Sequence, residues 1–259
     1  MENHTILFRR LCLIVLLLFI SLSYGQADID EKVQGEVSNS FKFSGIINLN
    51  TNGISPVPAF SLDKPSIIAT FSLERKRLKF NPEIAFSTKG KPWFISPRLT
   101  YKLVDGENFD FAISTQYSFS YSYPEELINN SLLTMTKVEH YTILQSTSTY
   151  VLSEKTSIGL TTFHGFGLKS ASIQRGNFLI LGGNITKLKI SEKLYHSLFP
   201  QLTYINLDGD TEGLFISCTF GVGHKSWPFF LSTQLTQSLA TNISPDPGFK
   251  WNVGLSYNF

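Results

Sequence analysis

The sequence predicts an all-β protein, a transmembrane up-and-down antiparallel β-barrel of about twelve strands. Three observations support this. Apolar residues make up 42% of the chain and charged residues only 16%, whereas soluble domains carry about 25% charged residues. Apolar and polar residues alternate in about twelve segments, and after the N-terminal region no apolar run is as long as a membrane-spanning helix. A closed barrel is the only other backbone arrangement that satisfies its own hydrogen bonds in lipid.

The N-terminus has the three parts of an export signal. Arg9 and Arg10 precede the apolar run 11–20, and the small and polar stretch 21–25 follows it. We expect residues 1–25 to be a signal peptide, residues 26–40 a polar N-terminal lead, and residues 41–259 the barrel domain. The alternative is a membrane anchor, but the run is shorter than the roughly 20 apolar residues that a spanning helix needs.

Cysteine content and charge narrow the chemistry further. Cleavage leaves Cys218 as the single cysteine, so an intramolecular disulfide is excluded. The full chain has 22 basic and 20 acidic residues, and cleavage removes Arg9, Arg10 and Glu2, which leaves 20 basic and 19 acidic residues. This near-neutral balance gives no reason to expect a nucleic-acid partner. We predict no cofactor.

Period-two alternation is clearest between residues 109 and 123. Odd positions carry Phe109, Phe111, Ile113 and further aromatics, while even positions are small or polar. A membrane barrel would turn the aromatic face to lipid and the polar face to its lumen, whereas a soluble sandwich would bury the aromatic face. The alternation alone does not decide between them. The twelve predicted strands are 41–50, 66–74, 78–88, 93–103, 109–123, 136–152, 156–166, 177–190, 194–206, 214–224, 229–237 and 250–259.

The predicted connections alternate between tight and longer, as they do at the two rims of an outer-membrane barrel. Tight turns surround 75–77, 105–106, 153–155, 191–193 and 225–227, and longer connections occupy 51–65, 124–131, 167–176, 207–213 and 238–249. The connection formed by residues 89–92 is short, although it lies at the rim that otherwise carries the longer connections. Pro82, Pro97 and Pro200 lie inside predicted strands, where we expect bulges or strand shifts.

The last ten residues resemble the terminal strand of Gram-negative outer-membrane β-barrel proteins. That strand ends on an aromatic residue and carries apolar residues at alternate positions, which the barrel-assembly machinery reads. The matching residues are Trp251, Val253, Leu255, Tyr257 and Phe259. The resemblance implies export to the bacterial outer membrane, with outer-membrane lipids and the assembly machinery as partners.

Two charge pairs are expected in the lumen. If the hairpin at 89–92 turns on its central residues, Glu83 faces Arg98, and the next hairpin places Lys102 opposite Asp110. The pairs are interpreted as ion pairs that brace the lumen, or as a charged eyelet.

No catalytic constellation emerges. His164, His196 and His224 lie on three different predicted strands, and each is on the same face as the apolar residues of its strand. We therefore expect these histidines not to converge on one site. The acidic loop Asp208, Asp210 and Glu212 has too few ligands for a calcium loop. We therefore expect a structural, binding or narrow pore protein. The alternative is a membrane-embedded lipid-modifying hydrolase.

Overall fold

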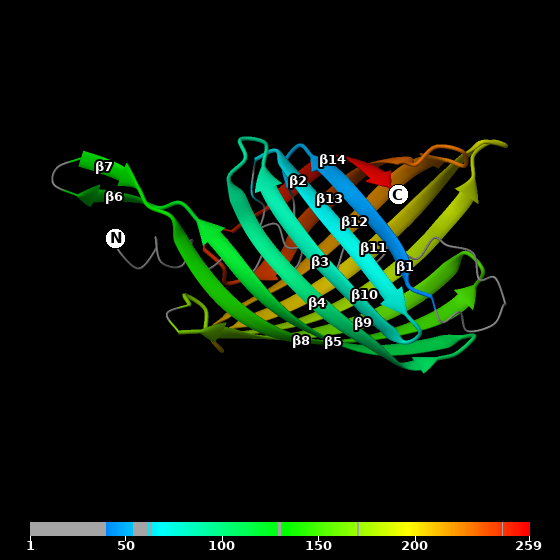
Figure 1. Cartoon of the computed structure of the whole chain (residues 1–259), viewed down its shortest axis with the longest axis horizontal. Helices are drawn as coiled ribbons and strands as arrows, with labels where there is room; N and C mark the ends of the chain where they lie inside the picture. Colours follow the sequence, from blue (N-terminus) through cyan, green and yellow to red (C-terminus); the bar gives the residue numbers. More distant parts are fainter. Residues whose placement is uncertain (1–39, 54–61, 63, 129–130, 170, 245) are drawn as a thin grey trace.

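The computed structural model describes residues 40–53, 62, 64–128, 131–169, 171–244 and 246–259, and it is all-β. Twelve antiparallel strands close into one barrel, in which each strand pairs with its neighbours in the chain and β1 pairs with β14 (Figure 1). The prediction of a closed twelve-strand barrel is confirmed. The strands are β1 (Lys42–Asn50), β2 (Ser66–Arg75), β3 (Leu78–Ser87), β4 (Pro92–Asp105), β5 (Phe109–Ser122), β8 (Lys137–Ser153), β9 (Thr156–Leu168), β10 (Arg175–Lys189), β11 (Leu194–Leu207), β12 (Thr211–His224), β13 (Phe229–Thr241) and β14 (Phe249–Asn258).

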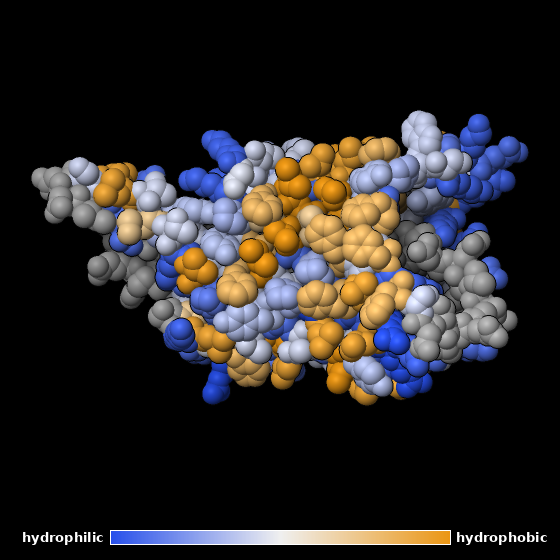
Figure 2. Space-filling model, in the orientation of Figure 1, coloured by the Kyte–Doolittle hydropathy of each residue, from blue (hydrophilic) through white to orange (hydrophobic). Residues whose placement is uncertain are grey.

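Alternating burial along β5 shows which face each residue occupies. Phe109, Ile113 and Tyr117 are at least 40% exposed, whereas Gln116 and Ser118 are at most 4% exposed. The aromatic face therefore points outward and the polar face inward, which is the barrel arrangement and excludes the sandwich. Figure 2 shows the result on the outside of the barrel, where apolar residues gather across the middle and hydrophilic residues gather at both ends.

The connections define two ends of the barrel, which we call the turn end and the loop end. The turn end carries the short connections after β2, β4, β8, β10 and β12, together with the start of β1 and the end of β14. At the loop end, the predicted loop 124–131 contains a hairpin of β6 (Glu125–Ile128) and β7 (Ser131–Thr134), which projects beyond the barrel wall (Figure 1). The predicted longer connection 207–213 is wrong, because β11 and β12 extend until only residues 208–210 separate them. Positive φ angles at Asp208 and Gly209 form this tight turn.

Bulges lie near two of the prolines, as expected, but not at the prolines themselves: one lies between Ala85 and Phe86, and another in β10 opposite Leu198 and His196. Pro82 pairs directly with Pro97, and the β3–β4 register continues on both sides of the pair. On its other side, β3 pairs with β2 at Phe80 and again at Glu83 in the same register, and the ladder is interrupted between these two residues. Pro200 pairs with Cys218 on β12 while the ladder to β10 is interrupted beside it. Each proline thus interrupts one ladder locally, because it has no N–H to donate.

The barrel closes where the two ends of the described chain meet. Five residue pairs join β1 to β14, and beyond them Gly45 and Phe259 exchange two backbone hydrogen bonds of 2.8 and 3.0 Å. The Phe259 ring lies over Gly45, so closely that an added Cβ would be 2.4 Å from it. Phe43 and Phe71 surround the same ring on the outer face. A glycine at position 45 is therefore required for the terminal aromatic residue to seat against the first strand.

The predicted signal peptide 1–25 and nearly all of the predicted lead 26–40 lie outside the described residues. Within the described part of the chain, no helix has the length and hydropathy needed to cross a membrane.

Candidate functional site in the barrel lumen

The lumen is lined mainly by polar side chains that the strand alternation turns inward. Buried polar residues come from nearly every strand of the barrel: Ser66, Ser72, Asn81, Glu83, Ser96, Arg98, Thr100, Gln116, Ser118, Ser120, Glu139, Gln145, Ser197, Thr203, Ser217, Thr219, Gln234, Thr236, Asn252 and Ser256. Soluble cores of this size are mainly apolar. The interior of this barrel is therefore a polar compartment enclosed by an apolar outer surface.

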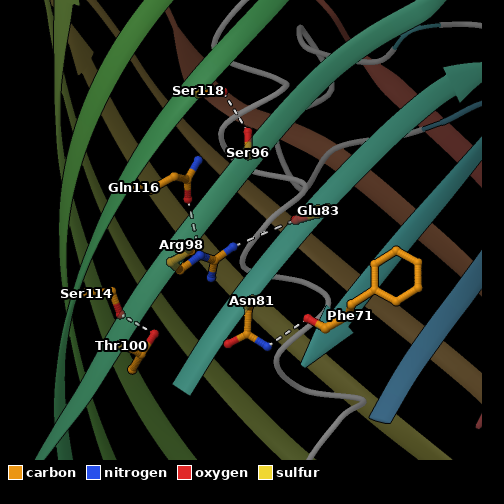
Figure 3. A network of polar contacts seen from close by, with 9 residues as sticks. All are labelled: Phe71, Asn81, Glu83, Ser96, Arg98, Thr100, Ser114, Gln116 and Ser118. Carbon is orange, nitrogen blue, oxygen red and sulfur yellow. Dashed lines mark hydrogen bonds and ion pairs between the residues drawn. The ribbon is translucent and has the colours of Figure 1, made fainter. Parts of the chain in front are cut away.

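A hydrogen-bonded network runs along the inner face of β3, β4 and β5 (Figure 3). At its centre, the Arg98 guanidinium lies 3.7 Å from a Glu83 carboxylate oxygen, and both side chains are at most 2% exposed. Arg98 Nε also donates to the Gln116 side-chain oxygen at 3.2 Å. Hydroxyl pairs flank this centre, with Ser96 and Ser118 at 2.7 Å and Thr100 and Ser114 at 2.9 Å. The network fixes the Arg98 side chain along the barrel wall.

The predicted register of the Glu83–Arg98 pair is wrong, although the ion pair is present. Arg98 lies opposite Asn81, and Glu83 lies opposite Ser96. The shift arises at the turn, which lies closer to β3 than predicted, so that Ser87 N–H bonds to the Lys91 carbonyl and Phe86 lies opposite Pro92. A bulge between Ala85 and Phe86, where the β4 strand contains an extra residue, offsets only one residue of this shift. Arg98 and Glu83 are therefore diagonal neighbours on the same face, within reach of a long side chain.

The second predicted pair also has the wrong register. Lys102 lies opposite Ala112, and Asp110 lies opposite Asp105, because the hairpin turns later than predicted, with Gly106 N–H bonded to the Phe109 carbonyl. A bulge between Lys102 and Val104 offsets only one residue of this shift. The Lys102 ammonium is 3.6 Å from the Asp105 carboxylate, and both side chains are at least 40% exposed. This ion pair lies at the turn end and not in the middle of the lumen.

An apolar cluster occupies the loop end of the lumen. It joins inward-facing strand residues to residues of the loops, and its buried members are Ile68, Ala85, Trp93, Phe94, Tyr141, Ile143, Phe163, Ala171, Ile173, Phe178, Ile180, Ile205, Leu207, Phe215 and Ile243. Phe94, Ile205 and Phe215 have no exposed surface. We call this group the loop-end cluster. It lies on the side opposite the start of β1 and the end of β14.

A buried carboxylate fastens the β9–β10 connection to the loop-end cluster. The Ser172 hydroxyl lies 2.8 Å from both oxygens of Glu139, and the Tyr141 hydroxyl donates to the same carboxylate at 2.8 Å. The Lys137 ammonium is 2.6 Å from it. Since Ala171 and Ile173 on either side of Ser172 are buried, this stretch of the connection packs into the barrel mouth. No pattern in the sequence indicates this arrangement, because a loop has no periodicity.

The histidines do not form a site. On the outer face, His164 Nδ1 donates a hydrogen bond of 2.9 Å to the Asn177 side-chain oxygen. The His196 ring lies against Phe220 and the His224 ring against Trp227. The predicted lack of convergence is confirmed. Among the described residues, no group of three or more His, Cys, Asp or Glu side chains could hold a metal ion.

The residues of the predicted assembly signal lie on the outer face of β14 and at its end. Trp251, Leu255, Tyr257 and Phe259 are each at least 40% exposed, and the Tyr257 ring contacts Phe229 and Phe259. In a membrane these side chains would face lipid, with the aromatic rings of Tyr257 and Phe259 at the turn-end rim.

No family model matches the chain, and no curated protein matches it by sequence. Solved structures do match. The KdgM porin is 9% identical with a TM-score of 0.51, and the alignment covers 83% of this chain and 99% of that one. The NanC porin is 8% identical with a TM-score of 0.50, covering 82% and 98%. An outer membrane channel from Pseudomonas putida F1 is 13% identical with a TM-score of 0.49, covering 89% and 99%. From the two porins above, we conclude that the chain has the fold of an outer-membrane β-barrel.

Proposed function

We propose that the protein is an outer-membrane channel with a narrow, hydrated lumen through which small solutes pass. In this proposal residues 1–25 direct export, and the barrel-assembly machinery inserts the barrel through the terminal strand that ends at Phe259. Outer-membrane lipids then surround the apolar outer face. The fold shared with the KdgM and NanC porins supports the proposal, and the chemistry of the lumen carries it.

The main observation is a set of lumen-facing polar atoms for which the described protein provides no hydrogen-bond partner. They belong to Ser66, Thr70, Gln116, Thr203 and Gln234, and they lie on both sides of the barrel. Buried polar groups in native proteins are nearly always hydrogen-bonded, to protein or to water. In the proposed channel, water or a passing solute would supply these bonds. A barrel that served only as a scaffold would be expected to fill its interior with mutually satisfied or apolar side chains.

Twelve strands suit this role. Eight strands leave an interior that side chains just fill, whereas sixteen or more leave a wide aqueous channel. The intermediate size predicts a small bore, and the loop-end cluster narrows it further. No catalytic step is included in the proposal.

The test is conductance of the purified barrel in planar lipid bilayers. We expect discrete steps of low conductance, absent from heat-unfolded protein. Phe215→Ala shortens a fully buried side chain of the loop-end cluster and should raise the conductance. Phe220→Ala is the matched control, because Phe220 lies on the outer face of the same strand and is 45% exposed. A folded barrel that gives no conductance, both as wild type and as Phe215→Ala, would contradict the proposal and favour a structural or adhesive role.

A further inference from the structure

The two sides of the lumen differ in charge. On β2 to β5, inward positions carry acidic and basic residues from the middle of the barrel to the turn end: Glu74, Lys79, Glu83, Arg98, Lys102, Asp105 and Asp110. We call this side the charged wall.

Opposite charges neutralise one another along the charged wall. Glu74 lies directly across the β2–β3 ladder from Lys79. Arg98 is 3.7 Å from Glu83, and Lys102 is 3.6 Å from Asp105. Paired charges attract a passing ion much less than an isolated charge would, because the field of each is largely cancelled by its neighbour.

The opposite side of the lumen, from β9 to β14, carries hydroxyl and amide groups. We call it the neutral wall. Its inward polar residues include Thr161, Asn184, Gln201, Thr203, Ser217, Thr219, Gln234, Thr236 and Asn252. Within these described strands, inward acidic or basic residues occur only near the ends. They are Lys187 in the turn-end bulge of β10, Lys189 just beyond that bulge, and Lys250 near the loop end.

The neutral wall provides hydrogen bonds that are not all used within the protein. The Thr203 hydroxyl and the Gln234 amide nitrogen are buried and have no partner in the described structure. On the charged wall, the side-chain amide nitrogen of Gln116 is also buried without a hydrogen-bond partner in the described structure. The amide oxygen of Gln116 accepts a hydrogen bond from Arg98. Donors and acceptors therefore face the lumen from both walls.

From this arrangement we propose that the solute is a small, neutral, polyhydroxylated molecule, such as a monosaccharide or a sugar alcohol. This inference rests on the proposed channel function. A polyol can exchange its hydrogen bonds to water for bonds to hydroxyl and amide groups at little net cost. An ion must give up part of its hydration in a narrow lumen, and the charges near the middle of the described walls, Glu83 and Arg98, already compensate each other.

The experiment compares three solutes with the same six-carbon skeleton, namely glucose, gluconate and protonated glucosamine. Their release from vesicles containing the purified barrel is measured directly, with the membrane potential held at zero by potassium and valinomycin. We expect glucose to leave about tenfold faster than either charged analogue, or more. Equal or faster release of a charged analogue would overturn the assignment of solute class and leave the channel proposal intact. If none of the three is released by barrel that migrates as folded protein, the channel proposal itself fails.

Two variants test whether the neutral wall is responsible. Gln234→Leu removes a lumen-facing amide, so glucose release should fall severalfold, while Thr233→Val, one residue away on the outer face, should leave it unchanged. Thr203→Glu places an unpaired carboxylate on the neutral wall and should raise the glucosamine rate relative to glucose. Unchanged solute preference in both folded lumen variants would show that the neutral wall does not select the solute. If Thr203→Glu does not fold, Gln234→Leu decides alone.

Discussion

The buried pair of Arg98 and Glu83 gives the sharpest prediction about the barrel. Arg98→Met removes the guanidinium that lies 3.7 Å from the Glu83 carboxylate, whose side chain is 1% exposed. Two unit charges at this distance interact by about 4–5 kcal/mol at an effective dielectric constant near 20. Breaking a buried ion pair by removing one partner costs about 3–5 kcal/mol. We therefore expect the free energy of unfolding to fall by about 3–5 kcal/mol.

Removing both charges should restore most of this loss. In Glu83→Gln combined with Arg98→Met, no unpaired charge remains in the lumen, and such neutral replacements are often as stable as the original pair. Lys102→Met is the matched control, since its ion pair with Asp105 is at least 40% exposed on both sides and should contribute about 0–1 kcal/mol. Urea unfolding in lipid vesicles, followed by tryptophan fluorescence, measures all variants. An Arg98→Met barrel as stable as wild type, or a double variant as unstable as the single one, would refute the reasoning.

Other predictions concern barrel closure and the outer-face histidines. Gly45→Ala should slow folding into vesicles and lower the folded fraction, because the added Cβ would clash with the Phe259 ring. Gly159→Ala is the control and should fold as wild type, because the nearest atom to its added Cβ is 3.4 Å away. Gel mobility without heating measures the folded fraction, and equal folding of both variants would count against the seating of the terminal ring. Phospholipids incubated with the barrel should stay intact by mass spectrometry. Turnover that disappears in His164→Ala or His196→Ala would instead support the lipid hydrolase.

The alternation in the sequence was sufficient to predict the twelve barrel strands and, in the regular ones, which residues share a face, but not which of the two faces is buried. In β5, a strict period of two places every aromatic residue on one side, and burial then follows the same period. The register was not predictable in the same way. Alternation is unaffected by a shift of two residues, so the earlier turn and the bulge near Trp93 together move Arg98 from Glu83 to Asn81 without changing which way either residue faces.

The loop-end cluster could not be predicted, for a different physical reason. Its strand members follow the inward parity, but Ala171, Ile173 and Ile243 belong to connections, where no periodicity indicates burial. Their packing depends on contacts with residues far away in the sequence. The hydrogen bonds between Ser172 and Glu139, 33 residues apart, are of this kind.

The position of Glu139 also indicates why the β9–β10 connection stays in the barrel mouth. A carboxylate that is 3% exposed is costly to bury unless donors surround it, and here Lys137, Tyr141 and Ser172 supply them. If the connection moved outward, Glu139 would lose the Ser172 hydroxyl at the same time as Ala171 and Ile173 left the apolar cluster. The hydrogen bond and the apolar contacts therefore oppose the same displacement.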